Sequence, residues 1–92
     1  MYKIYIRKMR FEEAKNKFLQ EIEHCFARGI EFVEVIHGIG TYTLRNMVLN
    51  EINNIEYIEL FNPLEYSMNP GSLKLVIKTP DKYTLYKYIE RE

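Results

Sequence analysis

The chain carries no net charge, since 13 lysine and arginine residues balance 13 aspartate and glutamate residues. A neutral protein lacks the broad positive field that is typical of many nucleic-acid-binding proteins. The sequence also lacks a second cysteine, which excludes an internal disulfide and favours a reducing compartment. It has no apolar run long enough to span a bilayer, and its basic, alternating first residues do not resemble a signal peptide. These absences predict a cytoplasmic protein with no membrane partner.

The usual ligand sets for metals and nucleotides are missing as well. Two isolated histidines and one cysteine do not give the regular spacing of a zinc site, so no metal or other cofactor is expected. Gly38-Ile39-Gly40 lacks the third glycine of a dinucleotide-binding turn and the Lys-Ser/Thr ending of a phosphate loop. No internal repeat, low-complexity tract or linker divides the chain, so residues 1–92 predict a single domain with a modest core.

The charges are unevenly spread along the chain. Residues 1–10 hold four basic residues and no acidic one, residues 11–70 have a net charge of −6, and residues 71–92 have a net charge of +2. We therefore expect one basic face and acidic helices, provided that the first and last strands lie near the glycine turn described below.

Hydrophobic periodicity predicts the order β-α-β-α-β-β. Apolar and polar residues that alternate, or a short buried apolar run, indicate strands at residues 2–6, 32–36, 57–61 and 73–78. Apolar residues at three-and-four spacing indicate helices at residues 11–28, with Arg10 as N-cap and Gly29 as stop, and at residues 41–52. Turn residues predict a loop at 62–72, and Thr79-Pro80 predicts a short closing helix at 82–90.

This order of elements predicts a two-layer α/β sandwich. Crossover connections place both helices on one face of a mixed four-stranded sheet and make the first two strands parallel to their neighbours. The last strand is expected to pair antiparallel, through the loop that precedes it.

The stretch from Glu34 to Arg45 joins a strand, a glycine-containing turn and a helix without any spacer. Such a turn lies at the carboxyl end of a strand, where open α/β sheets usually bind their ligands. Gly38 and Gly40 can adopt positive φ and allow another molecule to approach, and the following helix offers unpaired amides and a positive dipole end. The pattern predicts a small anion site with His37 at its mouth.

The same residues carry a family resemblance. His37-Gly38-Ile39-Gly40-Thr41, followed by Leu44-Arg45, resembles the His-Gly-x-Gly-Thr-Gly-x-Leu-Arg signature of the small MutS-related domain, the Smr domain. The first strand and the helix start Phe11-Glu12-Glu13-Ala14 are similar to the family too, so the resemblance covers about residues 4–78, with residues 79–92 as an extension. It implies binding of branched or single-stranded DNA or RNA, and several Smr domains are endonucleases that cut DNA or RNA.

The chain departs from the family pattern at both motifs. Where the family's first motif has aspartate, histidine and glycine, this chain has Tyr5, Arg7 and Lys8, and Tyr42 replaces the last glycine of the second motif. Tyrosine and arginine, with reference pKa values of about 10 and above about 12, are poor general bases near neutral pH. His37 is therefore the remaining candidate catalytic residue for phosphodiester cleavage. Arg7 can instead bind a phosphate with two hydrogen bonds.

The expected nucleic-acid site groups cations, glycines and one aromatic ring. We expect Tyr42 either to stack on an unstacked base or simply to pack on its helix, and Arg45 to contact a phosphate near the helix N-terminus. The alternative is a non-catalytic interaction module whose basic first segment holds nucleic acid or an acidic protein. The full set of predicted binding residues is Arg7, Lys8, Gly38, Gly40, Thr41, Tyr42 and Arg45.

Overall fold

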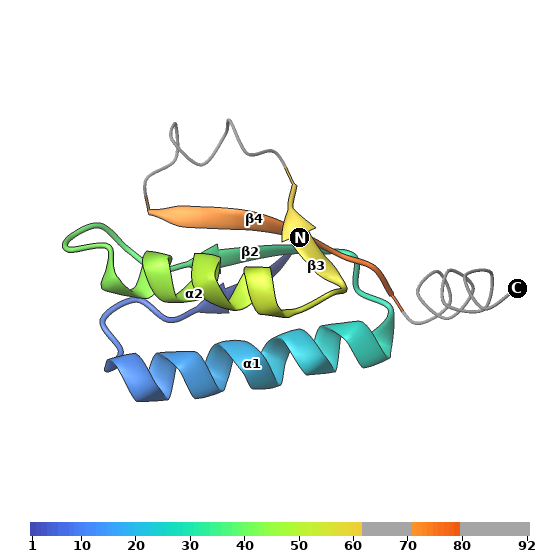
Figure 1. Cartoon of the computed structure of the whole chain (residues 1–92), viewed down its shortest axis with the longest axis horizontal. Coiled ribbons are helices and arrows are strands. Elements are labelled where there is room, and N and C mark those ends of the chain that lie inside the picture. Colours follow the sequence, from blue (N-terminus) through green and yellow to red (C-terminus); the bar gives the residue numbers. More distant parts are fainter. Residues whose placement is uncertain (62–70, 80–92) are drawn as a thin grey trace, which may run out of the picture.

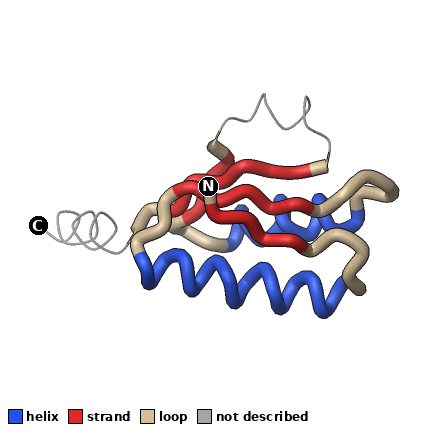
Figure 2. The backbone as a smooth tube through the Cα atoms, turned by 180° about the vertical axis from the view of Figure 1, so that it is seen from behind, coloured by secondary structure: helices blue, strands red, loops and turns tan. Residues whose placement is uncertain are grey.

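The computed structural model describes residues 1–61 and 71–79, which form two helices and a four-stranded sheet. Both helices cover the same face of the sheet (Figures 1 and 2). This confirms the predicted two-layer α/β architecture, whereas the closing helix expected at 82–90 and nearly all of the expected loop at 62–72 lie outside the described residues. In chain order the elements are β1 (Tyr2–Tyr5), α1 (Phe11–Arg28), β2 (Phe32–Ile36), α2 (Thr43–Asn54), β3 (Ile58–Leu60) and β4 (Ser72–Ile77).

The strand order is β1-β2-β4-β3. β1 and β2 are parallel, with Ile4 opposite Val35, as expected for strands joined by a crossover helix. β4 is antiparallel to both β2 and β3. The prediction that the second strand has parallel neighbours is therefore right for β1 and wrong for β4, which inserts between β2 and β3. Because of this insertion, Ile36 at the carboxyl end of β2 lies opposite Ser72 at the start of β4.

The core lies between the sheet and the two helices. Alternate strand residues turn toward the helices and are almost fully buried, and α1 meets them with Ala14, Phe18, Ile22 and Cys25. Burial of each large aliphatic or aromatic side chain stabilises the fold by roughly 1.5–3 kcal/mol. The strand residues of this core are Ile4, Val33, Val35, Ile58, Leu73, Leu75 and Ile77.

The helix termini set the geometry of the site. α1 follows Arg10, whose side chain makes no capping hydrogen bond, and ends at Gly29 in the left-handed conformation with φ +73°. α2 begins at Thr43 instead of residue 41, because Tyr42 takes a left-handed conformation with φ +60° as its N-cap. The Tyr42 side chain makes no capping hydrogen bond either. The first amides of α2 are therefore left to acceptors other than an N-cap side chain.

Candidate nucleic-acid interface

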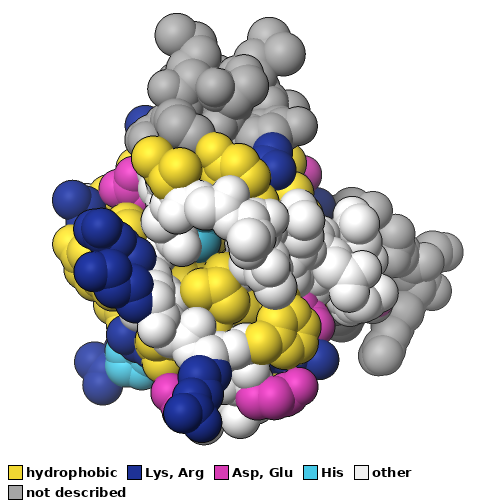
Figure 3. Space-filling model, turned by 90° about the vertical axis from the view of Figure 1, so that its left-hand side faces the viewer, with side chains coloured by type: hydrophobic (Ala, Val, Ile, Leu, Met, Phe, Trp, Pro, Cys, Tyr) yellow, Lys and Arg dark blue, Asp and Glu magenta, His cyan; other side chains and the backbone are white. Residues whose placement is uncertain are grey.

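A pocket lies at the end of the molecule where β1 and β2 finish and α2 begins. Figure 3 looks onto this end, where hydrophobic side chains gather in and around a hollow and lysine and arginine side chains border it. The structure brings all eight expected site residues into the lining: His37 and the seven predicted binding residues. Met9, Phe11, Ile39, Thr43 and Leu44 complete it.

The glycine turn after β2 is held in place by the start of β4. The amides of His37 and Gly38 both donate to the carbonyl oxygen of Gly71, each at 3.0 Å. Gly38 and Gly40 have φ angles of +82° and +151°, so the positive φ predicted for both glycines is confirmed. Because the first two amides of the turn bind Gly71, an anion in the pocket would depend on amides further along, at the N-terminus of α2.

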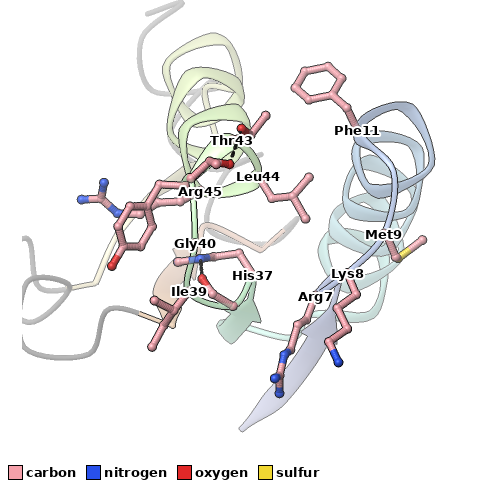
Figure 4. A pocket seen from close by; sticks show the side chains of 13 residues that line it. Arg7, Lys8, Met9, Phe11, His37, Ile39, Gly40, Thr43, Leu44 and Arg45 are labelled. Carbon is pink, nitrogen blue, oxygen red and sulfur yellow. Dashed lines mark hydrogen bonds between the residues drawn. The ribbon is translucent and has the colours of Figure 1, made fainter.

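Arg7 joins the loop after β1 to the glycine turn. A Cβ placed on Gly38 would lie only 2.9 Å from the Cγ of Arg7, whereas a Cβ on Gly40 would have no neighbour within 4 Å. The space beside Gly38 is thus filled by this chain's own arginine, and Gly40 is the glycine that stays open to another molecule. Figure 4 shows Arg7 and Lys8 on one side of the pocket and Arg45 on the other, with His37 and Leu44 between them.

His37 lies inside the pocket, with only 6% of its surface exposed, and not at the mouth as expected from the sequence. Its Nδ1 is 2.7 Å from the carbonyl oxygen of Gly38. A carbonyl can only accept, so Nδ1 carries the proton and Nε2 has the free lone pair of the neutral ring. Nε2 is buried and has no hydrogen-bond partner among the described residues. The neutral ring therefore carries a buried proton acceptor without a partner among the described residues, on a side chain that lines the pocket.

The surroundings of His37 favour this neutral form. Burial is the main effect and lowers the pKa of the imidazole. The hydrogen bond to the Gly38 carbonyl opposes it in part, and the positive charge of Arg45 adds a smaller lowering effect. His37 is therefore predominantly uncharged at neutral pH, and the positive charge of the pocket comes from Arg7, Lys8 and Arg45.

The Tyr42 ring contacts both His37 and Arg45. Its ring is edge-on to His37, with ring centroids 6.2 Å apart and an interplanar angle of 72°. The Cζ atom of Arg45 lies 5.3 Å from the centroid of the same ring, within the range of a cation–π contact. Next to it, the hydroxyls of Thr41 and Thr43 are 2.8 Å apart. Tyr42 thus packs on its own helix and at the same time lines the pocket.

Two features of the pocket were not predicted from the sequence. Asn69-Pro70-Gly71 signals a turn, but the role of the Gly71 carbonyl follows from the pairing of β4 with β2, which the strand pattern does not reveal. Much of the apolar lining comes from Met9, which precedes α1, and from Phe11 and Leu44 in the first turns of α1 and α2, whose apolar stripes were assigned to the core.

The described residues contain neither a cluster of metal ligands nor a membrane-spanning helix. Across residues 1–61 and 71–79, no three histidine, cysteine, aspartate or glutamate side chains gather as metal ligands would. Neither helix of that region is both long and apolar enough to cross a membrane.

These features define an α/β domain with a cation-bordered pocket at its strand ends. The model of the Smr domain family matches residues 4–71, and the chain belongs to this family. Smr domains are known for nucleic-acid binding and nicking.

The crystal structure of the Smr domain of Thermus thermophilus MutS2 is similar, with a TM-score of 0.64 and 22% identity over 84% of this chain and 96% of that chain. At this identity the likeness supports the fold alone. Among curated proteins no match was found.

Lys8 and Tyr42 stand at two positions where the resemblance to the family leads one to expect glycine, and both have a backbone conformation that favours glycine. Their φ angles are +64° and +60°, and they are the only non-glycine residues with positive φ in the described part of the chain. A left-handed conformation costs an L-residue about 1–2 kcal/mol. A lysine and a tyrosine therefore line the pocket at two positions whose backbone conformation would suit glycine.

Proposed function

We propose that this Smr domain binds single-stranded or branched nucleic acid in the pocket formed by the loop after β1, the glycine turn and the first turn of α2. The observation that carries the proposal is that Arg7, Lys8 and Arg45 all line one pocket of a chain without net charge. Arginine, lysine and helix N-termini are the groups that most often hold phosphates. A cytoplasmic location, favoured by the single cysteine, belongs to the same proposal.

Tyr42 is proposed to contact a base while the cations hold the backbone. Its ring is half-buried and lines the pocket beside Arg45. Stacking of an unpaired base on such a ring is worth about 1–3 kcal/mol in proteins that bind single strands. This contact requires a base outside a continuous duplex, so it favours single strands and branch points.

Nicking is the finer part of the proposal, and it rests on His37. Nε2 of the neutral ring is suited to accept a proton from an attacking water or hydroxyl. Arg7, Lys8 and Arg45 would stabilise the charge that develops on the phosphate. Tyr5, at the position of the family's aspartate, is exposed and lies outside the pocket lining. Catalysis would therefore depend on His37 alone for proton transfer, and we expect slow cleavage.

The test is a titration of labelled single-stranded DNA, branched DNA and RNA at two salt concentrations, with binding and cleavage both recorded. The wild type is compared with His37→Ala, with Arg45→Gln and with Arg28→Gln, whose arginine is exposed at the far end of α1. Loss of one phosphate contact should lower the slope of log affinity against log salt by about 1 for Arg45→Gln. Arg28→Gln should keep the wild-type slope.

The outcomes separate binding from catalysis. Cleavage that disappears in His37→Ala while binding persists would establish an endonuclease. Salt-dependent binding without cleavage would make the domain a binding module. No binding to any of the three nucleic acids would contradict the proposal and favour an acidic protein as the partner of the same cations.

A further inference from the structure

Ile39 is the most exposed large hydrophobic side chain of the described residues, with 75% of its surface accessible. It lies at the tip of the turn, between Gly38 and Gly40. Single exposed hydrophobic residues are common on protein surfaces, so exposure alone carries no argument. What distinguishes Ile39 is the way its turn is held and which side chains surround it.

The turn presents Ile39 from a fixed backbone. The amides of the two preceding residues, His37 and Gly38, are bound to the Gly71 carbonyl. The Ile39 side chain itself passes beside Gly71, the residue before β4, since a Cβ on Gly71 would be in ordinary contact with Ile39 Cγ1 at 3.8 Å. The apolar side chain is therefore supported at its base while most of its surface remains in water.

Cations stand on both sides of this apolar tip. Figure 4 shows Ile39 at the rim of the pocket, with Arg7 and Lys8 across from it and Arg45 on the side of α2. An aliphatic side chain between cations matches the chemistry of a distorted nucleic acid, where phosphates flank a base step whose faces are apolar. Proteins that kink or open nucleic acids commonly insert an isoleucine, leucine, methionine or phenylalanine at such a step.

We propose that Ile39 acts as a wedge at a junction between paired and unpaired nucleic acid, and that it sets the preference of this domain for branched over continuous duplex. The inference rests on the proposed function, because the cations must first hold the phosphates on either side. In a continuous duplex the bases remain stacked and the side chain has no apolar surface to cover. At a junction the terminal base pair exposes its face, and Ile39 can cover it.

The experiment compares a forked DNA with a continuous duplex of the same composition, each carrying 2-aminopurine next to the junction position. Wild type should bind the fork more tightly and raise the 2-aminopurine fluorescence as the labelled base unstacks. Ile39→Ala should weaken fork binding about tenfold, as expected for the loss of one buried aliphatic side chain, and should leave duplex binding unchanged. Ile39→Leu should retain both the preference and the fluorescence change.

The matched control is Phe32→Ala, which removes an exposed hydrophobic side chain (44% accessible) that is not part of the pocket lining. It should behave like wild type. Because Ile39 is exposed, Ile39→Ala should also keep the unfolding midpoint of wild type, so loss of fork binding will not reflect unfolding.

Three results would overturn the wedge. If Ile39→Ala keeps the fork preference and the fluorescence change while Arg45→Gln weakens binding, the wedge is wrong and the proposed function stands. If Phe32→Ala loses as much fork binding as Ile39→Ala, the effect is not specific to the turn. If wild type binds neither DNA, or binds anionic vesicles through Ile39 instead, the wedge is wrong. The nucleic-acid function is then wrong as well only if single-stranded DNA and RNA also fail to bind.

Discussion

The Cγ atom of Arg7 lies so close to Gly38 that a Cβ on this glycine would stand only 2.9 Å away. This contact joins the two segments that carry the site, the loop after β1 and the turn after β2. It also explains why position 38 requires a glycine for two separate reasons, its φ of +82° and the lack of space beside it. The guanidinium of Arg7 is therefore positioned by the packing of its own aliphatic stem.

Gly38→Ala should lower the free energy of unfolding by about 2–4 kcal/mol, because the strain of a left-handed alanine adds to a steric clash in a packed site. Gly29→Ala is the matched control. Gly29 has a similar φ of +73°, but a Cβ there would have no neighbour within 4 Å. In the control variant, the free energy of unfolding should fall by about 1–2 kcal/mol, from backbone strain alone. Urea unfolding measures both values.

A double-mutant cycle with Arg7→Ala identifies the cause of the difference. Truncating Arg7 removes the atom that the new Cβ meets, so Gly38→Ala should become about as mild as Gly29→Ala in that background. If both glycine variants lose the same free energy of unfolding in the wild-type background, the Arg7 contact does not constrain the turn.

Lys8→Gly should stabilise the fold and weaken nucleic-acid binding at the same time. Glycine relieves about 1–2 kcal/mol of left-handed strain and loses about 0.4–1 kcal/mol through the entropy of the unfolded chain, so the net gain in the free energy of unfolding is up to about 1.6 kcal/mol. Loss of the cation should lower the salt slope of binding by about 1. Thermal unfolding and a salt titration measure the two effects.

Lys8→Ala is the control that separates strain from charge. Alanine retains a Cβ in the left-handed conformation and lacks the ammonium group, so it should weaken binding like Lys8→Gly without raising stability. If both variants bind as tightly as wild type, Lys8 does not contact phosphate. Tyr42→Gly should gain less stability than Lys8→Gly, because it also loses the ring contacts with Arg45 and His37.

His37 should make the stability of the domain depend on pH below about 6.5. Its pKa is lowered in the folded state by burial, so the unfolded chain binds a proton more readily than the folded one. The contribution of the uncharged His37 to the free energy of unfolding is fully present above pH 6.5, which is about the ordinary pKa of histidine. It is lost as pH falls from there through the lowered pKa of the folded state. Urea unfolding from pH 7.5 down to 5 should show this loss.

His37→Gln should flatten that part of the stability curve, because glutamine does not titrate. A proton NMR titration of the imidazole gives the direct value, and its midpoint should lie below 6.5. A midpoint above 6.5, or an unchanged curve for His37→Gln, would contradict the buried neutral histidine described above.

The sequence predicted the layers and the contents of the pocket better than the order of the strands. Apolar periodicity placed α1 and β2 at their observed limits, and the family signature located the glycine turn. The insertion of β4 between β2 and β3 was not predicted, because alternation in residues 73–78 indicates a strand but not its partner. Long-range pairing depends on how a whole face is buried, which a single strand does not encode.

The finer geometry of the site depends on backbone conformations that cannot be predicted from the residue types. A tyrosine is an improbable residue for a left-handed N-cap, so the sequence suggested a helix that begins at residue 41, two residues before its observed start. The surroundings of His37 include the Tyr42 ring, the charge of Arg45 and the hydrogen bonds to Gly71, and these meet only in the folded chain. Sequence spacing identified the histidine but not its depth.

The most direct test of the central claim is an NMR titration of the ¹⁵N-labelled chain with a short single-stranded oligonucleotide. We predict that the largest amide shift changes fall on residues 7–11 and 37–45, and that they shrink in Arg45→Gln. The amide shifts of residues whose side chains lie on the helix-free face of the sheet, such as Phe32 and Lys74, should stay unchanged. Shift changes centred on that face, or none at all at millimolar oligonucleotide, would contradict a nucleic-acid site at the strand ends.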